Sequence, residues 1–353
     1  MSDRFTVRSS IRDYEVIFAD EFQVFLKEHL QPGDIALIDS NVFQLHQTAL
    51  QPVLADRSYQ LIEPSEEQKE YTALAPIIES LIQSGFRKNN RLIAIGGGII
   101  QDITAFIASM MFRGVSWFFY PSTLLAQCDS CIGGKSSINF GRYKNQIGNF
   151  CPPNQIVIDL RFLDTLPERD LRSGLGEMMH FYYVSGQADI DLIENEYDRC
   201  LTDRRIIQRL IRRSLEIKKA TIEIDEFDQA ERLLFNYGHT FGHAIESLTN
   251  YAIPHGVAVC MGMDLANTIS CKLGHITDDQ YTAMRPLLRK NIGDMSPGSI
   301  DLGVYEDALR KDKKSIGTQV NVILTKGPGK MFKTPLNLTD EVRSWIADFF
   351  KSF

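Results

Sequence analysis

The sequence predicts an α/β domain with a parallel sheet, followed by a mainly α-helical domain. In the first half, short apolar segments alternate with segments of helical spacing, which is typical of a parallel sheet covered by helices on both faces. After Glu168 the strand signals nearly vanish and helical periods dominate. The segment LDTLP, at residues 163–167, lies where the pattern changes. We therefore expect an α/β domain over residues 1–163 and a helical domain over residues 164–353.

The elements of the first half follow from apolar periodicity. Strands are expected at residues 14–18, 34–39, 59–63, 92–95, 115–120 and 156–159. Helices are expected at residues 21–30, at 67–86 and from 99 onward. The segment at 34–39 is almost wholly apolar and ends at Asp39, which is typical of a buried parallel strand.

The second half contains one apolar helical segment and several charged ones. Residues 171–183 are apolar on most faces, which predicts a buried helix. Residues 204–224 predict a charged helix that carries Lys218 and Lys219. Near the end of the chain, Lys313 and Lys314 precede a short expected strand.

Composition and charge restrict the partners of the chain. Its 353 residues are enough for two domains with sizeable cores. With a net charge of −7 and no basic block, nucleic acid and acidic membranes are not expected partners. The N-terminus lacks the apolar core of a signal peptide and no apolar run reaches the length of a membrane span, which predicts a cytoplasmic protein. Cys128 and Cys131 form a CxxC without a second pair, so reduced buried thiols are expected.

A triple glycine, Gly96 to Gly98, follows the expected strand at 92–95 and precedes a helix. Glycines permit close approach of a pyrophosphate to the backbone, and a helix N-terminus favours the anion. The pattern is not GxGxxG, so the segment is either a nucleotide site or only a turn. Asp39 likewise suits either a ribose hydroxyl or a helix cap.

The stretch at residues 121–150 is polar and rich in glycine. It contains Asp129, Lys135, Lys144 and Asn145 on glycine-bounded loops. Such residues suit a phosphate or a polyhydroxylated ligand, and a solvated loop is the alternative. Apolar flanking residues favour a ligand-lining segment.

Three histidines gather at residues 232–255. His239 and His243 are four apart on one helix face, and His255 follows Pro254. Clustered imidazoles among apolar residues indicate metal binding, acid–base work or core histidines. Glu177 and His180 share a face of the apolar helix at 171–183, and a buried carboxylate there needs a partner or a metal.

Together these segments resemble the dehydroquinate synthase family of sugar phosphate cyclases, over nearly the whole chain. The resemblance is carried by GGGIIQD at 96–102, MFRG at 111–114, PSTLLAQCDSCIGGKSSIN at 121–139, KNQIGNF at 144–150, LPERDLRSGLGEM at 166–178, FNYGHTFGHAIE at 235–246, HGVAV at 255–259 and DKK at 312–314.

The resemblance implies a dehydroquinate synthase-like fold, with a dinucleotide-binding α/β domain, a helical metal-binding domain and the active site between them. It implies a divalent metal, Zn²⁺ or Co²⁺, held by Glu177, His239 and His255. It also implies NAD, with the contacting positions Asp39, Glu67, Gly97, Gly98, Asp102, Ser122 and Thr123. A homodimer is expected, with Arg113 reaching the phosphate in the neighbouring subunit.

The substrate positions also follow from the resemblance. They are Asp129, Lys135, Asn145, Lys218, Arg232, Asn236, His243 and one of Lys313 and Lys314. Among them the candidate catalytic residues are Asp129, Lys135, His243 and Lys218, and His180 is a further substrate-binding candidate. Lys135, Asn145, Asn236, His243 and the C-terminal lysine would hold the phosphate. Arg232 and Lys218 would face the end of the substrate that carries a carboxylate in the dehydroquinate case.

The implied reaction eliminates phosphate and closes a carbocycle, while NAD removes and restores one hydride. The first candidate is 3-dehydroquinate synthase, which acts on 3-deoxy-arabino-heptulosonate 7-phosphate. Cyclisation of sedoheptulose 7-phosphate or glucose 6-phosphate is an alternative. A metal-dependent polyol dehydrogenase and a cofactor-binding protein without turnover are two further alternatives.

Several positions depart from the family pattern, and two of them bear directly on the expected sites. His180 stands where the family typically has a lysine, which changes a long fixed cation into a shorter group that can be neutral. The glutamate–lysine pair expected at the adenine end is only partly visible, with Glu67 in place and Glu70 where a lysine is usual.

Overall fold

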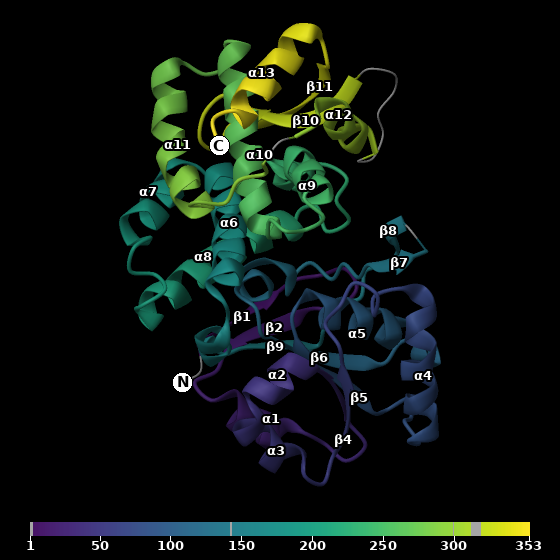
Figure 1. Cartoon of the computed structure of the whole chain (residues 1–353). Coiled ribbons are helices and arrows are strands. Elements are labelled where there is room, and N and C mark those ends of the chain that lie inside the picture. The colour runs from purple at the N-terminus through teal and green to yellow at the C-terminus, as the bar shows by residue number, and fades with distance from the viewer. Residues whose placement is uncertain (1–2, 142, 299, 312–318) are drawn as a thin grey trace. The chain divides into compact units, whose positions relative to one another are not determined.

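The computed structural model describes residues 3–141, 143–298, 300–311 and 319–353 (Figure 1). The chain forms two compact units. The first unit takes Met1–Leu166 together with Ile222–Phe227, and the second takes Pro167–Thr221 and Asp228–Phe353. The first unit thus includes a short return segment, which a single boundary at residue 163 does not describe.

The first unit is built on a seven-stranded sheet with the order β1-β2-β9-β6-β5-β3-β4. Its strands are β1 (Asp3–Val7), β2 (Tyr14–Phe18), β3 (Ile35–Asp39), β4 (Ser58–Ile62), β5 (Arg91–Gly96), β6 (Ser116–Pro121) and β9 (Gln155–Ile158). All neighbours pair in parallel except β1 and β2, whose pairing is antiparallel. The expected parallel sheet is confirmed, and the antiparallel edge strand β1 was not predicted.

Helices cover both faces of this sheet. They are α1 (Phe22–His29), α2 (Ser40–Leu45), α3 (Gln47–Leu54), α4 (Leu74–Gln83) and α5 (Gly98–Met110). On one face α1, α2 and α3 enclose a core with Ile38, Ile95 and Val157 of the strands, and these three helices lie together in Figure 1. On the other face α5 packs against β3, β5 and β6.

Shorter elements complete the first unit. They are the helical turns η1 (Tyr71–Ala73), η2 (Met111–Arg113), η3 (Ala126–Ser130) and η4 (Leu160–Thr165), and the hairpin of β7 (Ile138–Phe140) and β8 (Tyr143–Ile147). The helix expected at 67–86 is wrong at its N-terminal end, because α4 begins only at Leu74. Before it, Glu70 pairs with Asn139 as an isolated bridge, so the backbone there is extended toward β7.

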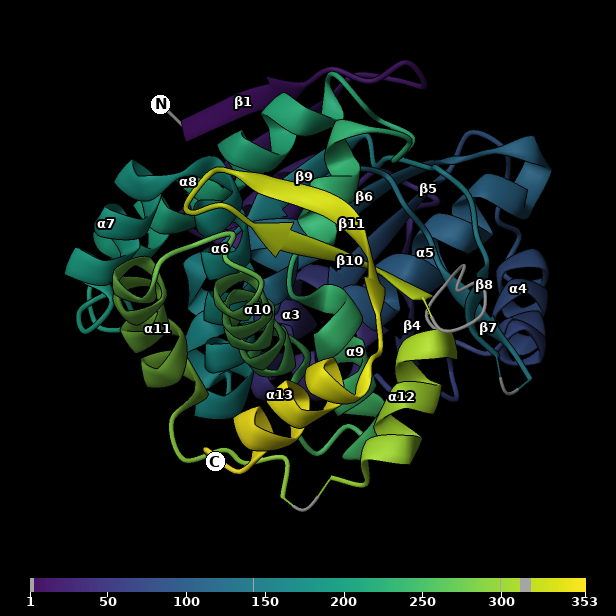
Figure 2. The same ribbon diagram turned by 90° about the horizontal axis from the view of Figure 1, so that it is seen from above.

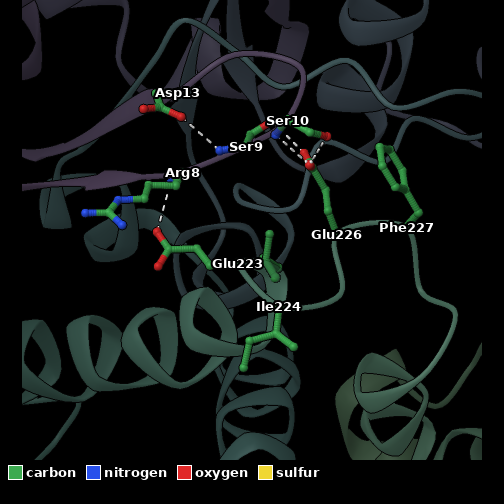
Figure 3. Close-up of a pocket in the computed structure, with 9 residues that line it drawn as sticks. Arg8, Ser9, Ser10, Asp13, Glu223, Ile224, Glu226 and Phe227 are labelled. Carbon is green, nitrogen blue, oxygen red and sulfur yellow. Dashed lines mark hydrogen bonds between the residues drawn. The ribbon is translucent and has the colours of Figure 1, made fainter.

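The return segment is fastened to the N-terminal strand region of the first unit. Glu226 accepts hydrogen bonds from the backbone and hydroxyl of Ser10, at 2.8 and 2.6 Å, and from the hydroxyl of Ser9 at 2.5 Å (Figure 3). Glu223 accepts from the backbone of Arg8 at 2.8 Å. Phe227 packs edge-on against Phe150, with ring centroids 5.0 Å apart. These groups border a surface hollow of about 330 Å³.

The second unit is mainly helical, as predicted. Its helices are α6 (Glu168–Ser185), α7 (Gln187–Glu196), α8 (Arg204–Ile222), η5 (Glu231–Asn236), α9 (His239–Leu248), α10 (His255–Lys272), α11 (Asp278–Ile292), α12 (Leu302–Lys311) and α13 (Asp340–Phe350). The strands β10 (Gln319–Thr325) and β11 (Met331–Asn337) form an antiparallel hairpin, of which the sequence predicted only the first strand, and β10 packs against α10 (Figure 2). The central helix α10 is buried along most of its length and contacts α6, α9 and α11.

Within the described residues, no helix is both long and apolar enough to cross a membrane. Cys128 and Cys131 are buried and not disulfide-bonded, as expected.

Candidate functional site

Close packing of α6, α9 and α10 brings the histidines and Glu177 together. A Cβ added to Gly176 would lie 2.0 Å from the carbonyl oxygen of Gly256, and one added to Gly242 would lie 2.9 Å from that of Ala258. No side chain fits at these crossings, so the helix backbones approach one another directly. Because each of these glycines is next in sequence to a histidine or to Glu177, the same crossings place the polar side chains side by side.

Three side-chain atoms converge at this crossing. Glu177 Oε1 lies 2.8 Å from His255 Nε2 and 3.3 Å from His239 Nε2. The three potential ligand atoms lie within 4.8 Å of one another. One carboxylate and two imidazoles form a ligand set that Zn²⁺ accepts, with coordination positions left for a substrate.

The outer nitrogens of both imidazoles have partners of their own. His255 Nδ1 lies 2.9 Å from Glu246 Oε2, and His239 Nδ1 lies 3.3 Å from the carbonyl oxygen of Tyr237. An acceptor at Nδ1 keeps the proton there and leaves the Nε2 lone pair for a cation. Glu246 was not among the site residues predicted from the sequence, although its spacing from His239 and His243 on α9 places it on the same helix face.

The charges of the cluster suit a cation. Burial would raise the pKa of Glu177, but His239 and His255 outweigh it and hold that pKa well below its usual range. Burial would lower the pKa of His255, but the adjacent carboxylates of Glu177 and Glu246 raise it well above its usual range. Among the described residues, no donor points at Glu177 Oε1 in good hydrogen-bonding geometry, although both imidazoles lie close to it. This donor set therefore fits a divalent metal ion.

His180 lies one helical turn from Glu177 and is almost fully buried, with 1 % of its surface exposed. Its ring packs edge-on against Phe181, Phe235 and His239, at centroid distances of 4.9, 5.8 and 4.8 Å. Burial and the neighbouring His239 lower its pKa to about 3, so the imidazole is neutral. Neither ring nitrogen has a hydrogen-bond partner among the described residues.

The other residues expected in the second unit differ in their burial. Lys218 on α8 and Arg232 in η5 are buried cations, with 7 % and 5 % of their surfaces exposed. His243 is half-buried, with its ring centroid 5.5 Å from that of His239. Asn236 is exposed and donates to the carbonyl oxygen of Leu233 at 2.9 Å. Lys313 and Lys314 lie outside the described residues.

In the first unit the glycine turn leaves the N-terminus of α5 open. Gly97 is the N-cap residue and no side chain caps the helix. A Cβ added to Gly98 would meet no atom within 4 Å, whereas one added to Gly97 would lie 3.0 Å from Thr123. An uncapped helix N-terminus beside open space suits the pyrophosphate of a dinucleotide.

Asp102, on α5 one turn beyond this N-terminus, forms an ion pair with Lys69. Lys69 Nζ is 2.7 Å from Asp102 Oδ2 and donates to Asn145 Oδ1 at 3.0 Å. Burial raises the pKa of Asp102 to about 6, although Lys69 lowers it. Lys69 was not among the residues predicted from the sequence.

Glu67 and Glu66 differ in what they contact. Glu67 is exposed. Glu66 accepts from Asn139 at 2.8 Å and lies 3.6 Å from the ammonium of Lys144. Glu66 and Lys69, three residues apart, are therefore the pair that the structure connects to this part of the unit.

Asp39, Ser122 and Thr123 lie at the ends of neighbouring strands. Asp39 caps α2 through Oδ1, which accepts from the backbones of Asn41 and Val42 at 2.8 and 3.2 Å. The capping alternative for Asp39 is thus observed, and its burial raises its pKa. The buried Ser122 hydroxyl has no partner among the described groups, and Thr123 Oγ1 accepts from the backbone of Ala126 at 3.1 Å.

The remaining expected residues of the first unit lie on exposed or half-buried segments. Asp129 is half-buried in η3, and Lys135 and Asn145 are exposed. Asn145 has a left-handed backbone, with φ of 56°. Arg113 is exposed in η2 and is also left-handed, with φ of 61°.

Comparisons with known proteins agree with this arrangement. Residues 59–173 match the family described as 3-dehydroquinate synthase N-terminal, and residues 174–315 match 3-dehydroquinate synthase C-terminal. The 3-dehydroquinate synthase of Alkaliphilus metalliredigens is 34% identical over 312 residues, covering 87% of this chain and 88% of that protein. That of Pelobacter propionicus is 37% identical over 283 residues, covering 80% and 78%.

Solved structures share the fold. A 2-deoxy-scyllo-inosose synthase complexed with carbaglucose-6-phosphate, NAD⁺ and Co²⁺ has a TM-score of 0.85 at 21% identity, covering 99% of this chain and 100% of that one. The 2-epi-5-epi-valiolone synthase ValA of Streptomyces hygroscopicus subsp. jinggangensis, with NAD⁺ and Zn²⁺ bound, has a TM-score of 0.85 at 22% identity, covering 99% of each chain. A probable glycerol dehydrogenase of Sinorhizobium meliloti has a lower TM-score of 0.63 at 13% identity, covering 95% of each chain. The coverage by relatives above 30% identity shows that the chain belongs to the 3-dehydroquinate synthase family.

Proposed function

We propose that this chain is an NAD- and divalent-metal-dependent sugar phosphate cyclase, namely a 3-dehydroquinate synthase. It converts 3-deoxy-arabino-heptulosonate 7-phosphate to 3-dehydroquinate with loss of phosphate. The observation that carries the proposal is the convergence of Glu177 Oε1, His239 Nε2 and His255 Nε2 in a chain of the 3-dehydroquinate synthase family. A carboxylate with two imidazoles suits Zn²⁺ or Co²⁺, the ions bound in the two solved cyclases.

Each unit is proposed to bind one of the two cofactors. In the second unit, Glu177, His239 and His255 would hold the metal, which supplies Lewis-acid polarisation of a substrate hydroxyl. In the first unit, Gly97 and Gly98 would receive the dinucleotide pyrophosphate at the N-terminus of α5, and NAD supplies a reversible hydride acceptor. Further NAD contacts are proposed for Asp39, Glu66, Glu67, Lys69, Asp102, Ser122 and Thr123.

The buried cations of the second unit suit an anionic substrate. Lys218 and Arg232 are both less than 10 % exposed, and a cation in such a position binds an anionic group more strongly than an exposed one does. We assign them to the carboxylate of the heptulosonate, where a guanidinium can bind both oxygens. Asn236 and His243 are proposed to bind the phosphate, together with one of Lys313 and Lys314.

The first unit is proposed to supply further polar groups to the substrate. Lys135 and Asn145 would bind phosphate oxygens, and Asp129 would accept from a substrate hydroxyl. The left-handed backbone of Asn145 is costly for a non-glycine residue, and such strain is often found at binding sites. Its side chain is held by Lys69, which links the phosphate group to the ion pair on α5.

We also propose that the enzyme is a cytoplasmic homodimer in which Arg113 reaches the neighbouring site. Phe112 and Arg113 both have positive φ, and Met110 and Phe112 are 59 % and 43 % exposed. A second copy of the chain would cover these apolar side chains.

Phosphate release across a substrate panel tests the proposal. The panel contains 3-deoxy-arabino-heptulosonate 7-phosphate, sedoheptulose 7-phosphate and glucose 6-phosphate, each with NAD and Zn²⁺. We expect release only from the first substrate, with Glu177→Gln reducing the rate at least ~10³-fold because a metal ligand is lost. Release from one of the other two sugars alone would reassign the substrate, and no release from any would reject the proposed activity.

A further inference from the structure

We propose that His180 is a positioning residue, whose Nδ1 donates a hydrogen bond to Glu177 Oε2 and so presents Oε1 to the metal. The inference rests on the proposed metal site. The oxygen concerned is Glu177 Oε2, which is not one of the expected metal ligands. His180 is also the position where the family typically has a lysine.

The first observation is that His180 lacks a partner where it needs one. Both ring nitrogens are buried without a hydrogen bond among the described groups. An unsatisfied buried polar group costs about 1–3 kcal/mol, so such groups are rarely left alone in native proteins. His180 therefore gains stability if one of its ring nitrogens forms a hydrogen bond.

The second observation is the identity of the polar atoms within reach. His180 Nδ1 lies 3.8 Å from Glu177 Oε2, and the two residues are three apart on α6. Phe181 and Phe235 offer only apolar edges, and the two nitrogens of His239 lie close to the carbonyl oxygen of Tyr237 and to Glu177 Oε1. Lys218, near the Phe181 ring, carries only donors. The acceptor that suits an Nδ1–H is thus Glu177 Oε2.

The third observation is that the two carboxylate oxygens of Glu177 have different neighbours. Oε1 faces His239 and His255, whereas Oε2 is the oxygen nearest His180. The group of described ligand atoms that lie within 4.8 Å of one another contains Glu177, His239 and His255 but does not include His180. His180 therefore stands behind the ligand carboxylate and outside the ligand set.

These observations have a direct parallel in the same site. Glu246 Oε2 is 2.9 Å from His255 Nδ1 and orients that imidazole from behind. His180 would do the same for Glu177, with donor and acceptor exchanged. Outer hydrogen bonds of this kind typically change metal affinity by about 10–100-fold.

The test compares His180→Phe, His180→Asn and His180→Gln with the unaltered protein. Phe keeps a ring among Phe181 and Phe235 but has no nitrogen. Asn places its amide nitrogen near the position of Nδ1, whereas Gln reaches the position of Nε2. Zinc affinity is measured by competition with a chelator, and the visible absorption of the Co²⁺-loaded protein reports the coordination geometry. Glu246→Gln, which removes the charge from the acceptor of His255 Nδ1, serves as the benchmark for a weakened outer hydrogen bond.

We expect His180→Phe and His180→Gln to bind Zn²⁺ about 10–100-fold more weakly, as Glu246→Gln does, with His180→Asn close to the unaltered protein. Thermal melting of the metal-free variants shows whether each one folds, and His180→Asn keeps the test decisive if His180→Phe does not. Unchanged affinity in His180→Phe would overturn the inference in favour of packing alone. Equal losses in His180→Asn and His180→Phe, with a changed Co²⁺ spectrum, would overturn it in favour of direct ligation. An unaltered protein that takes up no metal would instead reject the proposed function.

Discussion

Glycines occur at both candidate sites, and they do opposite things there. In the first unit, a Cβ on Gly98 would enter open space at the N-terminus of α5. In the second unit, a Cβ on Gly176 would lie 2.0 Å from the carbonyl oxygen of Gly256. The first glycine leaves room for a ligand, and the second leaves room for another helix.

This difference separates two ways of building a site. Near Gly98 the proposed binding surface is the backbone itself, because no side chain caps the helix beside the space that the glycine leaves. Near Gly176 the helix backbones only pack against each other, and the proposed metal ligands are the side chains that this packing brings together. Substitutions at the two positions should therefore affect different properties.

Gly176→Ala should have the largest effect. Its methyl group would collide with the backbone of α10, so α6 must shift, at a cost of about 3 kcal/mol in the free energy of unfolding. The shift also separates Glu177 from His255, so zinc affinity should fall at least ~10-fold. Urea denaturation and chelator competition measure the two effects. Gly303→Ala in α12 is the matched control, because only an aspartate side chain lies near it, and it should not destabilise the protein.

Lys69→Met tests whether a buried ion pair supports the first site. The folded pKa of Asp102 is about 6, against a reference value of 3.8, so stability is lost as the pH rises through this interval. Without Lys69 that pKa rises further, and the loss continues above pH ~6. The variant should be destabilised by about 1–3 kcal/mol, and the difference from the unaltered protein should grow as the pH rises above ~6.

The control for this pH dependence is the double variant Lys69→Met with Asp102→Asn. Because it has no titrating carboxyl at residue 102, its difference from Asp102→Asn alone should not change with pH. A difference for Lys69→Met that stays constant between pH ~5 and ~8 would show that Asp102 is not the group responsible.

Gly98→Ala should affect binding rather than stability. Alanine suits the first turn of a helix, so the free energy of unfolding should be unchanged or higher by up to about 1 kcal/mol. The methyl group would occupy the space proposed for pyrophosphate, so NAD should bind about 10-fold more weakly, equivalent to about 1.4 kcal/mol. Calorimetric titration with NAD measures this change. Equal NAD affinity in the variant would remove the contrast between the two glycines.

The smallest effect is expected for Glu226→Gln in the return segment. An amide has one acceptor oxygen where the carboxylate has two, so some bonds to Ser9 and Ser10 are lost or weakened (Figure 3). Because the segment is partly exposed, the free energy of unfolding should fall by only about 1 kcal/mol. Urea denaturation of Glu226→Gln and of the unaltered protein measures this change. An unchanged free energy of unfolding would show that these hydrogen bonds do not stabilise the return segment.

The sequence predicted those parts of the fold and site that depend on local pattern. His239 and His243 are on one helix, and the parallel strands were recognisable from their apolar runs. Lys69 was missed because its burial depends on Asp102 and Asn145, which are distant in sequence. Gly176 was not singled out because only the crossing of α6 and α10 shows what its missing side chain allows. The return segment at Ile222–Phe227 likewise depends on long-range hydrogen bonds to residues 8–10.

The central claim is that NAD serves as a catalyst while phosphate is eliminated. The most direct measurement supplies 3-deoxy-arabino-heptulosonate 7-phosphate in large excess over NAD, with Zn²⁺ present, and follows phosphate and NADH absorbance together. We predict many phosphates released for each NAD, with no steady accumulation of NADH. One NADH formed for each substrate consumed, without phosphate, would contradict the claim and identify a polyol dehydrogenase.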